Sequence, residues 1–133
     1  MVSGGAPSPR RSPNFFLALD ILILEGYGMT ELSAPSTINT PGGCKIGTVG
    51  RPLPGVDVRI ADDGEILVRA PSVFDGYHKL PDLTAETVVD GWMHTGDIGA
   101  FDEDGFLKIT DRKKTSSSRP AEKHRAAEPG KPA

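Results

Sequence analysis

The sequence predicts an α/β chain with a β-rich part, and three observations support this. A short apolar run at residues 21–24 leads into closely spaced glycines, which is the pattern of a buried strand followed by a turn. Residues 56–60 and 65–69 alternate in part between apolar and polar side chains, and an Asp-Asp-Gly turn separates them. The 133 residues also include 16 glycines and 12 prolines, which favours short strands and turns over long helices.

The composition narrows the class of protein. The formal net charge of −3 argues against nucleic acid as a main partner. Cys44 is the single cysteine, so no internal disulfide can form, and a reducing, cytoplasmic location is expected. No apolar run approaches the ~20 residues that a membrane span needs, and we expect no secretory signal at the N-terminus, where no long apolar segment ends in small residues. Peripheral attachment to a membrane stays open.

The first third of the chain is expected to hold a helix end, one strand and a long loop. Residues 15–24 are mostly apolar, which predicts a helix end and then the buried strand. The strand should turn sharply at Gly26 and Gly28, because glycine accepts backbone angles that other residues avoid. Residues 32–43 are rich in Ser, Thr, Pro and Gly and are expected to form a loop.

The rest of the chain is expected to be a small antiparallel sheet or barrel followed by a disordered tail. Residues 81–89 predict a short helix, and 101–106 an Asp/Gly hairpin with a return strand at 107–109. Residues 115–133 contain no Val, Ile, Leu, Phe, Tyr or Trp, so they cannot contribute to a core. The predicted division is an α/β end at 1–44, a β-barrel-like part at 45–110, a hinge at 111–114 and a tail at 115–133.

The residues that follow the first strand can bind a nucleotide. Tyr27 offers a flat ring for a base, Thr30 a hydroxyl for a phosphate, and Glu31 a carboxylate for magnesium. Ligands gather at the carboxyl ends of strands in open α/β sheets. A plain strand with a glycine turn is the alternative, because a Gly-x-Gly pair is a weak signal.

Three stretches in order resemble one family. Residues 26–31, Gly-Tyr-Gly-Met-Thr-Glu, resemble the Gly-Tyr-Gly-x-Thr-Glu signature of the adenylate-forming (AMP-binding) enzymes, and Thr-Gly-Asp at 95–97 and Asp-Arg-Lys-Lys at 111–114 match in the right order. The amino-acid sequences of residues 46–69 and 90–114 are most similar to those of bacterial long-chain fatty-acid–CoA ligases. The resemblance implies the C-terminal part of the large N-terminal domain of an acyl-adenylate-forming enzyme, with the small C-terminal domain missing.

The resemblance also implies residue roles. Tyr27 would pack on adenine, Asp97 would accept both ribose hydroxyls, Arg112 would reach the ribose or a phosphate, and Lys114 would be the hinge. Thr30 and Glu31 would be the catalytic pair, Glu31 also holding magnesium. The nucleotide-binding set is Gly5, Gly26, Tyr27, Gly28, Met29, Thr30, Asp97 and Arg112. From local sequence alone, Asp97 could instead cap a turn, and Arg112 could belong to a solvated charge run.

By resemblance, the reaction joins a fatty acid to ATP, with Mg²⁺, and passes the acyl group to coenzyme A. The family's phosphate loop and the lysine of its C-terminal domain are not in this sequence, so we expect a truncated or frameshifted fragment that is inactive alone. A pyrophosphate-release assay with palmitate and ATP tests this. A complementing fragment carrying the phosphate loop is one expected partner. The alternatives are a non-catalytic nucleotide-binding or interaction module, or an adenylation domain of another adenylate-forming enzyme.

Overall fold

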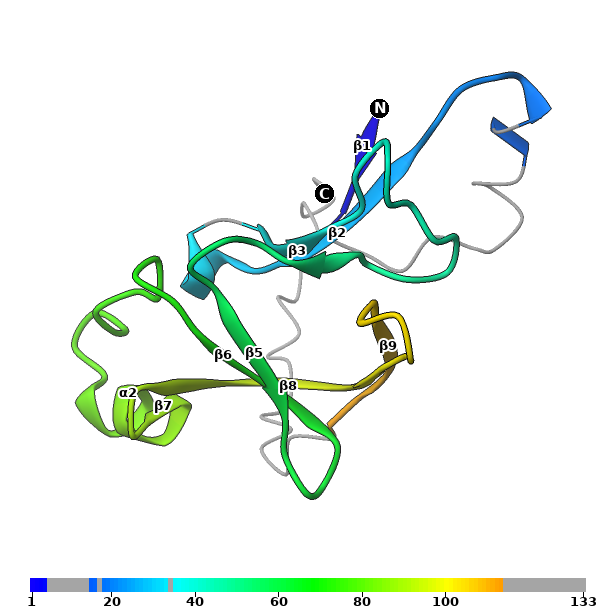
Figure 1. Cartoon of the computed structure of the whole chain (residues 1–133). Helices are drawn as coiled ribbons and strands as arrows, with labels where there is room; N and C mark the ends of the chain where they lie inside the picture. Colours follow the sequence, from blue (N-terminus) through cyan, green and yellow to red (C-terminus); the bar gives the residue numbers. More distant parts are fainter. Residues whose placement is uncertain (5–14, 17, 34, 114–133) are drawn as a thin grey trace, which may run out of the picture.

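The residues that the structure describes form two sheets that meet at a shared core. The computed structural model describes residues 1–4, 15, 16, 18–33 and 35–113. Gly5, Lys114 and the predicted tail lie outside these residues. The first sheet lies in the upper half of Figure 1 and the second in the lower half. Mixed sheets with few helices match the predicted fold class.

The first sheet has four strands in the order β1-β2-β3-β4. Its strands are β1 (Val2–Ser3), β2 (Leu24–Gly28), β3 (Pro35–Ile38) and β4 (Arg51–Pro52). β1 pairs with β2 in parallel, and the other neighbours are antiparallel. A short 3-10 helix, η1 (Thr30–Leu32), connects β2 towards β3.

The predicted position of the first strand and its glycine turn is wrong. The strand begins at Leu24, where the prediction ended it, and it continues through Gly26 and Gly28. Ile21 is exposed rather than buried. Gly26 does not form a turn, and it is needed because β2 approaches β3 closely at this point. A Cβ at Gly26 would lie 3.1 Å from the carbonyl oxygen of Thr37 on β3. The two backbones approach so closely that a side chain does not fit comfortably between them.

The predicted loop at 32–43 is also partly wrong, because it contains β3. The two middle residues of this strand, Ser36 and Thr37, are polar and yet buried. The hydroxyl of Thr37 donates to the carbonyl oxygen of Val49 at 2.7 Å, and the side-chain amide of Asn39 donates to the carbonyl oxygen of Thr48 at 2.7 Å. Since the polar groups of Thr37 and Asn39 have partners, these two side chains can be buried without a large desolvation cost.

The second sheet confirms the predicted antiparallel sheet and both predicted hairpins. Its order is β5-β6-β8-β7, with β9 also paired to β8. The strands are β5 (Asp57–Ile60), β6 (Glu65–Arg69), β7 (Val88–Val89), β8 (Trp92–Phe101) and β9 (Leu107–Arg112). The predicted short helix is α2 (Pro81–Thr87), which has a proline in its first turn. β9 is longer than its predicted range, 107–109, and includes Arg112. The predicted division of the chain into four parts stays a prediction.

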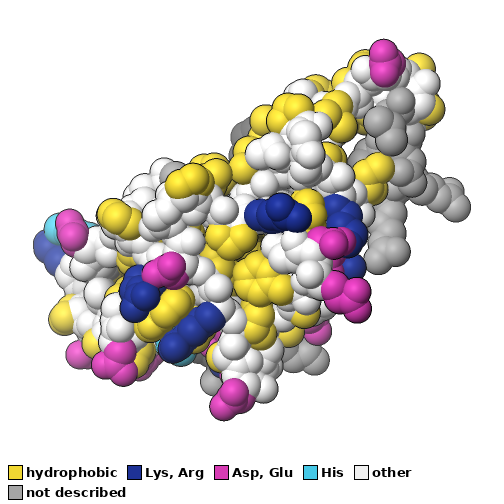
Figure 2. Space-filling view, viewed as in Figure 1, with side chains coloured by type: hydrophobic (Ala, Val, Ile, Leu, Met, Phe, Trp, Pro, Cys, Tyr) yellow, Lys and Arg dark blue, Asp and Glu magenta, His cyan; other side chains and the backbone are white. Residues whose placement is uncertain are grey.

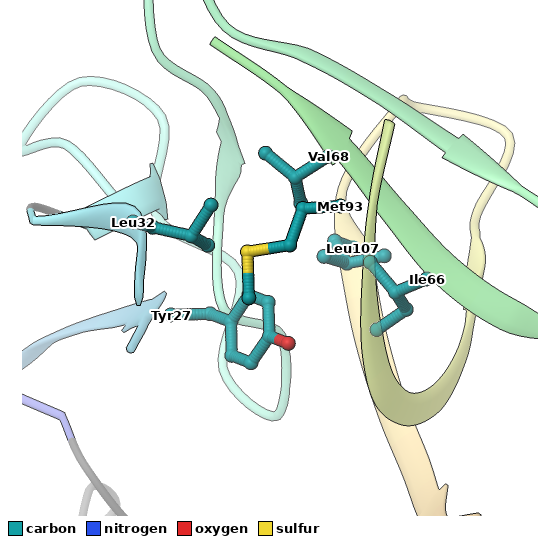
Figure 3. Packing of buried hydrophobic residues seen from close by; sticks show 6 residues of the cluster. All are labelled: Tyr27, Leu32, Ile66, Val68, Met93 and Leu107. Atoms are coloured by element: carbon teal, nitrogen blue, oxygen red, sulfur yellow. The ribbon is translucent and has the colours of Figure 1, made fainter. Parts of the chain in front are cut away.

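The core lies where the two sheets face each other. Tyr27 and Leu32 come from the first sheet and its following turn, and Met93 of β8 extends its sulfur towards them (Figure 3). The remaining buried apolar residues of this cluster are Ile66, Val68 and Leu107. On the face shown in Figure 2, Lys and Arg side chains lie beside Asp and Glu side chains and form no continuous basic area. Among the residues that the structure describes, no helix has the length and apolar character to cross a bilayer.

Candidate functional site

Three residues that are far apart in sequence meet at one point between the sheets. The hydroxyl of Tyr27 on β2 donates to Asp97 Oδ2 on β8 at 2.8 Å. Arg112 Nε on β9 lies 3.6 Å from Asp97 Oδ1, because Asp97 and Arg112 are register partners. The side chain of Asp97 is 16% exposed and that of Arg112 is 78% exposed. Asp97 is therefore a partly buried carboxylate that is held on one side and flanked by a cation on the other.

A β-bulge places Asp97 at this point. Glu65 on β6 faces Ile98 on β8, and Leu67 faces His94, so three residues of β8 oppose the single residue Ile66. Bulges bend a strand and redirect its side chains. The bulge contains the Thr-Gly-Asp motif, and its middle residue, Gly96, has a φ of +72°, which glycine adopts at little cost.

The ring of Tyr27 belongs to the core, while its hydroxyl belongs to the site. The residue is 7% exposed and lies in the cluster with Met93. Burial, together with the hydrogen bond to Asp97, raises the pKa of Tyr27 far above its usual value, against the opposing effect of Thr95. The hydroxyl thus stays protonated and acts as a donor to Asp97 at any physiological pH.

Glu31 and Thr30 lie on η1, directly after β2. Glu31 Oε1 accepts a hydrogen bond of 2.8 Å from the hydroxyl of Tyr77, and its backbone carbonyl accepts one of 2.8 Å from the amide of Phe74. Thr30 is exposed at the start of the turn. The carboxylate of Glu31 is therefore held by a segment that lies more than forty positions later in the sequence.

An open pocket lies beside the glycines of β2. Its volume is about 210 Å³, and its lining includes Gly4, Gly26 and Gly28. Met29 follows directly and packs against the core cluster. Of the residues predicted for the nucleotide, Gly5 and Lys114 fall outside the described part of the chain, so their positions stay predictions.

Sequence reasoning missed three residues that hold this site. Tyr77 binds Glu31, and Glu65 and Lys113 bind each other and the bulge. The one available signal for Glu65 was a carboxylate directly before Ile66-Leu67-Val68 in a buried strand, since buried acids are rare unless they are paired. His94 Nδ1 on β8 also contacts Glu65, with 3.1 Å between the ring nitrogen and Oε2.

A family profile described as "AMP-binding enzyme" matches residues 1–78. The chain belongs to the AMP-binding enzyme family. The match contains Tyr27, Glu31 and Tyr77 but ends before Asp97 and Arg112, which reach the site through the fold.

Curated relatives agree with this family. The chain is 53% identical to the long-chain-fatty-acid–CoA ligase FadD15 of Mycobacterium bovis over 113 residues, which cover 85% of this chain and 19% of that protein. It is 45% identical to the human long-chain-fatty-acid–CoA ligase 6, with 86% of this chain and 18% of that protein covered. The chain therefore spans about a fifth of the length of these relatives.

Solved structures also share this fold, and two of them match most of this chain. One is O-succinylbenzoate coenzyme A synthetase from Bacillus subtilis in complex with ATP and magnesium ion, with a TM-score of 0.75, 30% identity, and 84% of this chain and 26% of that chain covered. The other is apo MatB from Rhodopseudomonas palustris, with a TM-score of 0.79 and 36% identity. The match covers 86% of this chain and 25% of the MatB chain. This member of the AMP-binding enzyme family thus corresponds to about a quarter of each of those two chains.

Proposed function

We propose that this chain forms the adenine- and ribose-binding part of the ATP site in a fatty-acid–CoA ligase. The observation that carries the proposal is the meeting of Tyr27, Asp97 and Arg112 at one point. The identity of 53% to a long-chain-fatty-acid–CoA ligase supports the substrate class, and the ATP and magnesium ion named for a structural relative support the nucleotide.

Asp97 is suited to bind the two ribose hydroxyls. An ionised carboxylate only accepts hydrogen bonds and has room for several donors. The hydroxyl of Tyr27 takes one of these positions and orients the group, while Arg112 lies close enough to balance its charge. Arg112 is mostly exposed, so its guanidinium has free donors for a ribose or phosphate oxygen.

Thr30 and Glu31 are suited to bind the phosphate end of ATP and its magnesium ion. The exposed hydroxyl of Thr30 can donate to a phosphate oxygen. No cluster of three His, Cys, Asp or Glu within the described ranges could hold a metal ion by itself. That fits magnesium, which usually binds one or two carboxylates together with substrate phosphates, here Glu31. When bound, Mg²⁺ would neutralise phosphate charge.

The proposed reaction has two steps. A fatty-acid carboxylate oxygen attacks the α-phosphorus of ATP, and pyrophosphate leaves from it to give an acyl-adenylate. The sulfur of coenzyme A then attacks the acyl carbon, the thiol proton is lost, and AMP leaves. The residues of this chain would hold the adenosine in place in both steps, which lowers the entropy cost of each attack. Lys114 is proposed as the hinge between the two steps, and Gly5 as part of the adenosine-binding loop.

Titration of the ¹⁵N-labelled chain with AMP, followed by NMR, tests the nucleotide site. We expect saturable shifts in β2 and β8 in the millimolar range. Asp97→Asn should weaken AMP binding about tenfold, because hydrogen bonds to a charged group are worth roughly 1.5–3 kcal/mol. Asp57→Asn is the control, since Asp57 is an exposed carboxylate that pairs with Arg69 on β5–β6, away from the bulge. Equal affinity of the wild-type chain and the Asp97→Asn variant would overturn the proposal.

A further inference from the structure

The bulge that carries Asp97 depends on side chains to satisfy its backbone. The regular pairing of β6 with β8 is interrupted between Glu65 and Leu67 of β6. The bulge residues of β8 therefore lose the backbone hydrogen-bond partners that a regular strand would give them. The amide of Asp97 donates to the hydroxyl of Thr95 at 3.2 Å, and that hydroxyl donates to the carbonyl oxygen of Ile66 at 2.7 Å. The amide of Gly96 donates to Glu65 Oε1 at 2.9 Å. Glu65 therefore directly supports the residue next to Asp97.

Glu65 is an unusually placed carboxylate. Its side chain is 6% exposed, and it precedes three buried apolar residues of β6. A buried charge is costly unless it is paired and hydrogen-bonded. Its second oxygen, Oε2, meets both requirements, because Lys113 Nζ and His94 Nδ1 each lie 3.1 Å away. The carboxylate thus contacts His94 and Gly96 of β8 and Lys113, which directly follows β9.

Lys113 connects the same carboxylate to the strand that carries Arg112. Its backbone amide donates to the carbonyl oxygen of Gly96 at 2.7 Å, and its side chain reaches Glu65 and Asp63. Gly96 is therefore bound on both sides, through its amide to Glu65 and through its carbonyl to Lys113. Asp97 and Arg112 are the sequence neighbours of these two residues and pair with each other.

We propose that Glu65 is a positioning residue for ribose recognition: its buried carboxylate holds the β8 bulge and Lys113, and so sets the orientation of the Asp97 carboxylate towards the ribose hydroxyls. This inference rests on the proposed nucleotide function. Glu65 does not touch the nucleotide in this scheme and acts through Gly96 and Asp97.

The ionisation of Glu65 is consistent with this role. Burial disfavours its charge, but the hydrogen bonds from His94, the Gly96 amide and Lys113 together outweigh burial, so the pKa of Glu65 lies below its ordinary value. The carboxylate is therefore charged at neutral pH and can bind all three donors at once.

The test compares AMP with 2′,3′-dideoxy-AMP, which lacks the ribose hydroxyls, by NMR titration of the whole chain. The ratio of the two affinities measures ribose recognition alone. In Glu65→Gln the side chain keeps its shape and can still accept from Gly96, but it loses its charge for Lys113. We expect the ratio to fall about tenfold with little change in 2′,3′-dideoxy-AMP binding. A merely structural role would weaken both ligands equally and leave the ratio unchanged, which would overturn the proposal.

Two surface variants provide a matched control. Lys113→Gln and Asp63→Asn both remove the exposed Lys113–Asp63 pair, but only Lys113→Gln removes the cation from Glu65. We expect the ratio to fall in Lys113→Gln and to stay at the wild-type value in Asp63→Asn. If Glu65→Gln does not fold by circular dichroism, Lys113→Gln decides: an unchanged ratio overturns the inference, as does an equal fall in Asp63→Asn.

The failure of this inference differs from the failure of the proposed function. A wild-type chain that binds AMP and 2′,3′-dideoxy-AMP equally would show that Asp97 does not bind the ribose, and both proposals would fall. A wild-type chain that prefers AMP, with the preference lost in Asp97→Asn but kept in Glu65→Gln and Lys113→Gln, would overturn the role of Glu65 and leave the nucleotide function standing.

Discussion

Single residues at the junction of the sheets show how closely the site and the core are joined. Tyr27 packs its ring against Met93 and donates its hydroxyl to Asp97. Gly50 also contacts both sheets: its carbonyl oxygen accepts from the amide of Leu107 on β9 at 2.8 Å, and its α-carbon lies against the backbone of Ile38 at the end of β3. Both residues hold a strand of one sheet against the other.

Gly50→Ala is predicted to destabilise the chain strongly. The new Cβ would lie 1.9 Å from the carbonyl carbon of Ile38, which is backbone and cannot move aside, and the residue has a φ of +86°. We expect a loss of more than about 2 kcal/mol in the free energy of unfolding by urea. Gly55→Ala is the control, because Gly55 has a φ of +80° but no atom within 4 Å of the added Cβ. It should cost about 1 kcal/mol for the backbone alone. Equal losses would contradict the packing argument.

At the scale of elements, the β8–β9 hairpin is held by its turn as well as by its ladder. Asp102 accepts from the amides of Asp104 and Phe106 and pairs with Lys45, which lies 2.8 Å away in the loop before β4. Lys45 also pairs with Asp104 at 2.6 Å. The hairpin that ends at Arg112 is thereby tied to the loop that connects β3 and β4 of the first sheet.

This hairpin is predicted to weaken in acid. The close ion pair with Lys45, with the hydrogen bonds from the backbone, lowers the pKa of Asp102 from 3.8 to about 2. Between these two values the unfolded chain takes up a proton that the folded chain does not, so the stabilisation is full above pH 3.8 and is lost as the pH falls towards about 2. Urea unfolding of the wild-type chain and Asp102→Asn should show a stability difference that shrinks across this window. A difference that is the same at both ends would contradict the assignment.

For the whole molecule, one cluster joins the two sheets. Met93 is 1% exposed and lies between Tyr27 of the first sheet and Val68 of the second (Figure 3). Since each sheet has few strands, neither buries much apolar surface by itself. We therefore expect the described part of the chain to unfold as one cooperative unit.

Met93→Ala is predicted to destabilise both sheets together by about 2–5 kcal/mol, the usual cost of emptying a buried site of this size. Amide hydrogen exchange measures this, because protection in β2 and in β6 should fall by the same factor. Leu83→Ala is the control: Leu83 is 43% exposed on α2, so a loss below about 0.5 kcal/mol is expected. A fall in protection confined to β6 would show that the sheets unfold independently.

Local sequence signals predicted the second sheet well and the first sheet poorly. Asp-Gly turns and alternating side chains are local properties, so both hairpins and the helix at Pro81–Thr87 were predicted correctly. β3 was missed because its two middle residues are polar, and their burial depends on partners such as Val49 that lie further along the chain. The strand near Gly26 was misplaced because its glycines serve a close approach to β3, which local sequence does not reveal.

The sequence by itself determined the hairpins, the helix and the family, and it identified Tyr27, Asp97 and Arg112 as candidate ligand residues. It could do so because turn residues, side-chain alternation and motifs are properties of short stretches of sequence. Only the tertiary structure decided that these three residues meet, that a bulge places Asp97, and that Glu65 and Tyr77 hold the site. The physical reason is that hydrogen bonds between distant strands depend on register and burial, and these are set by the packing of the two sheets rather than by neighbouring residues.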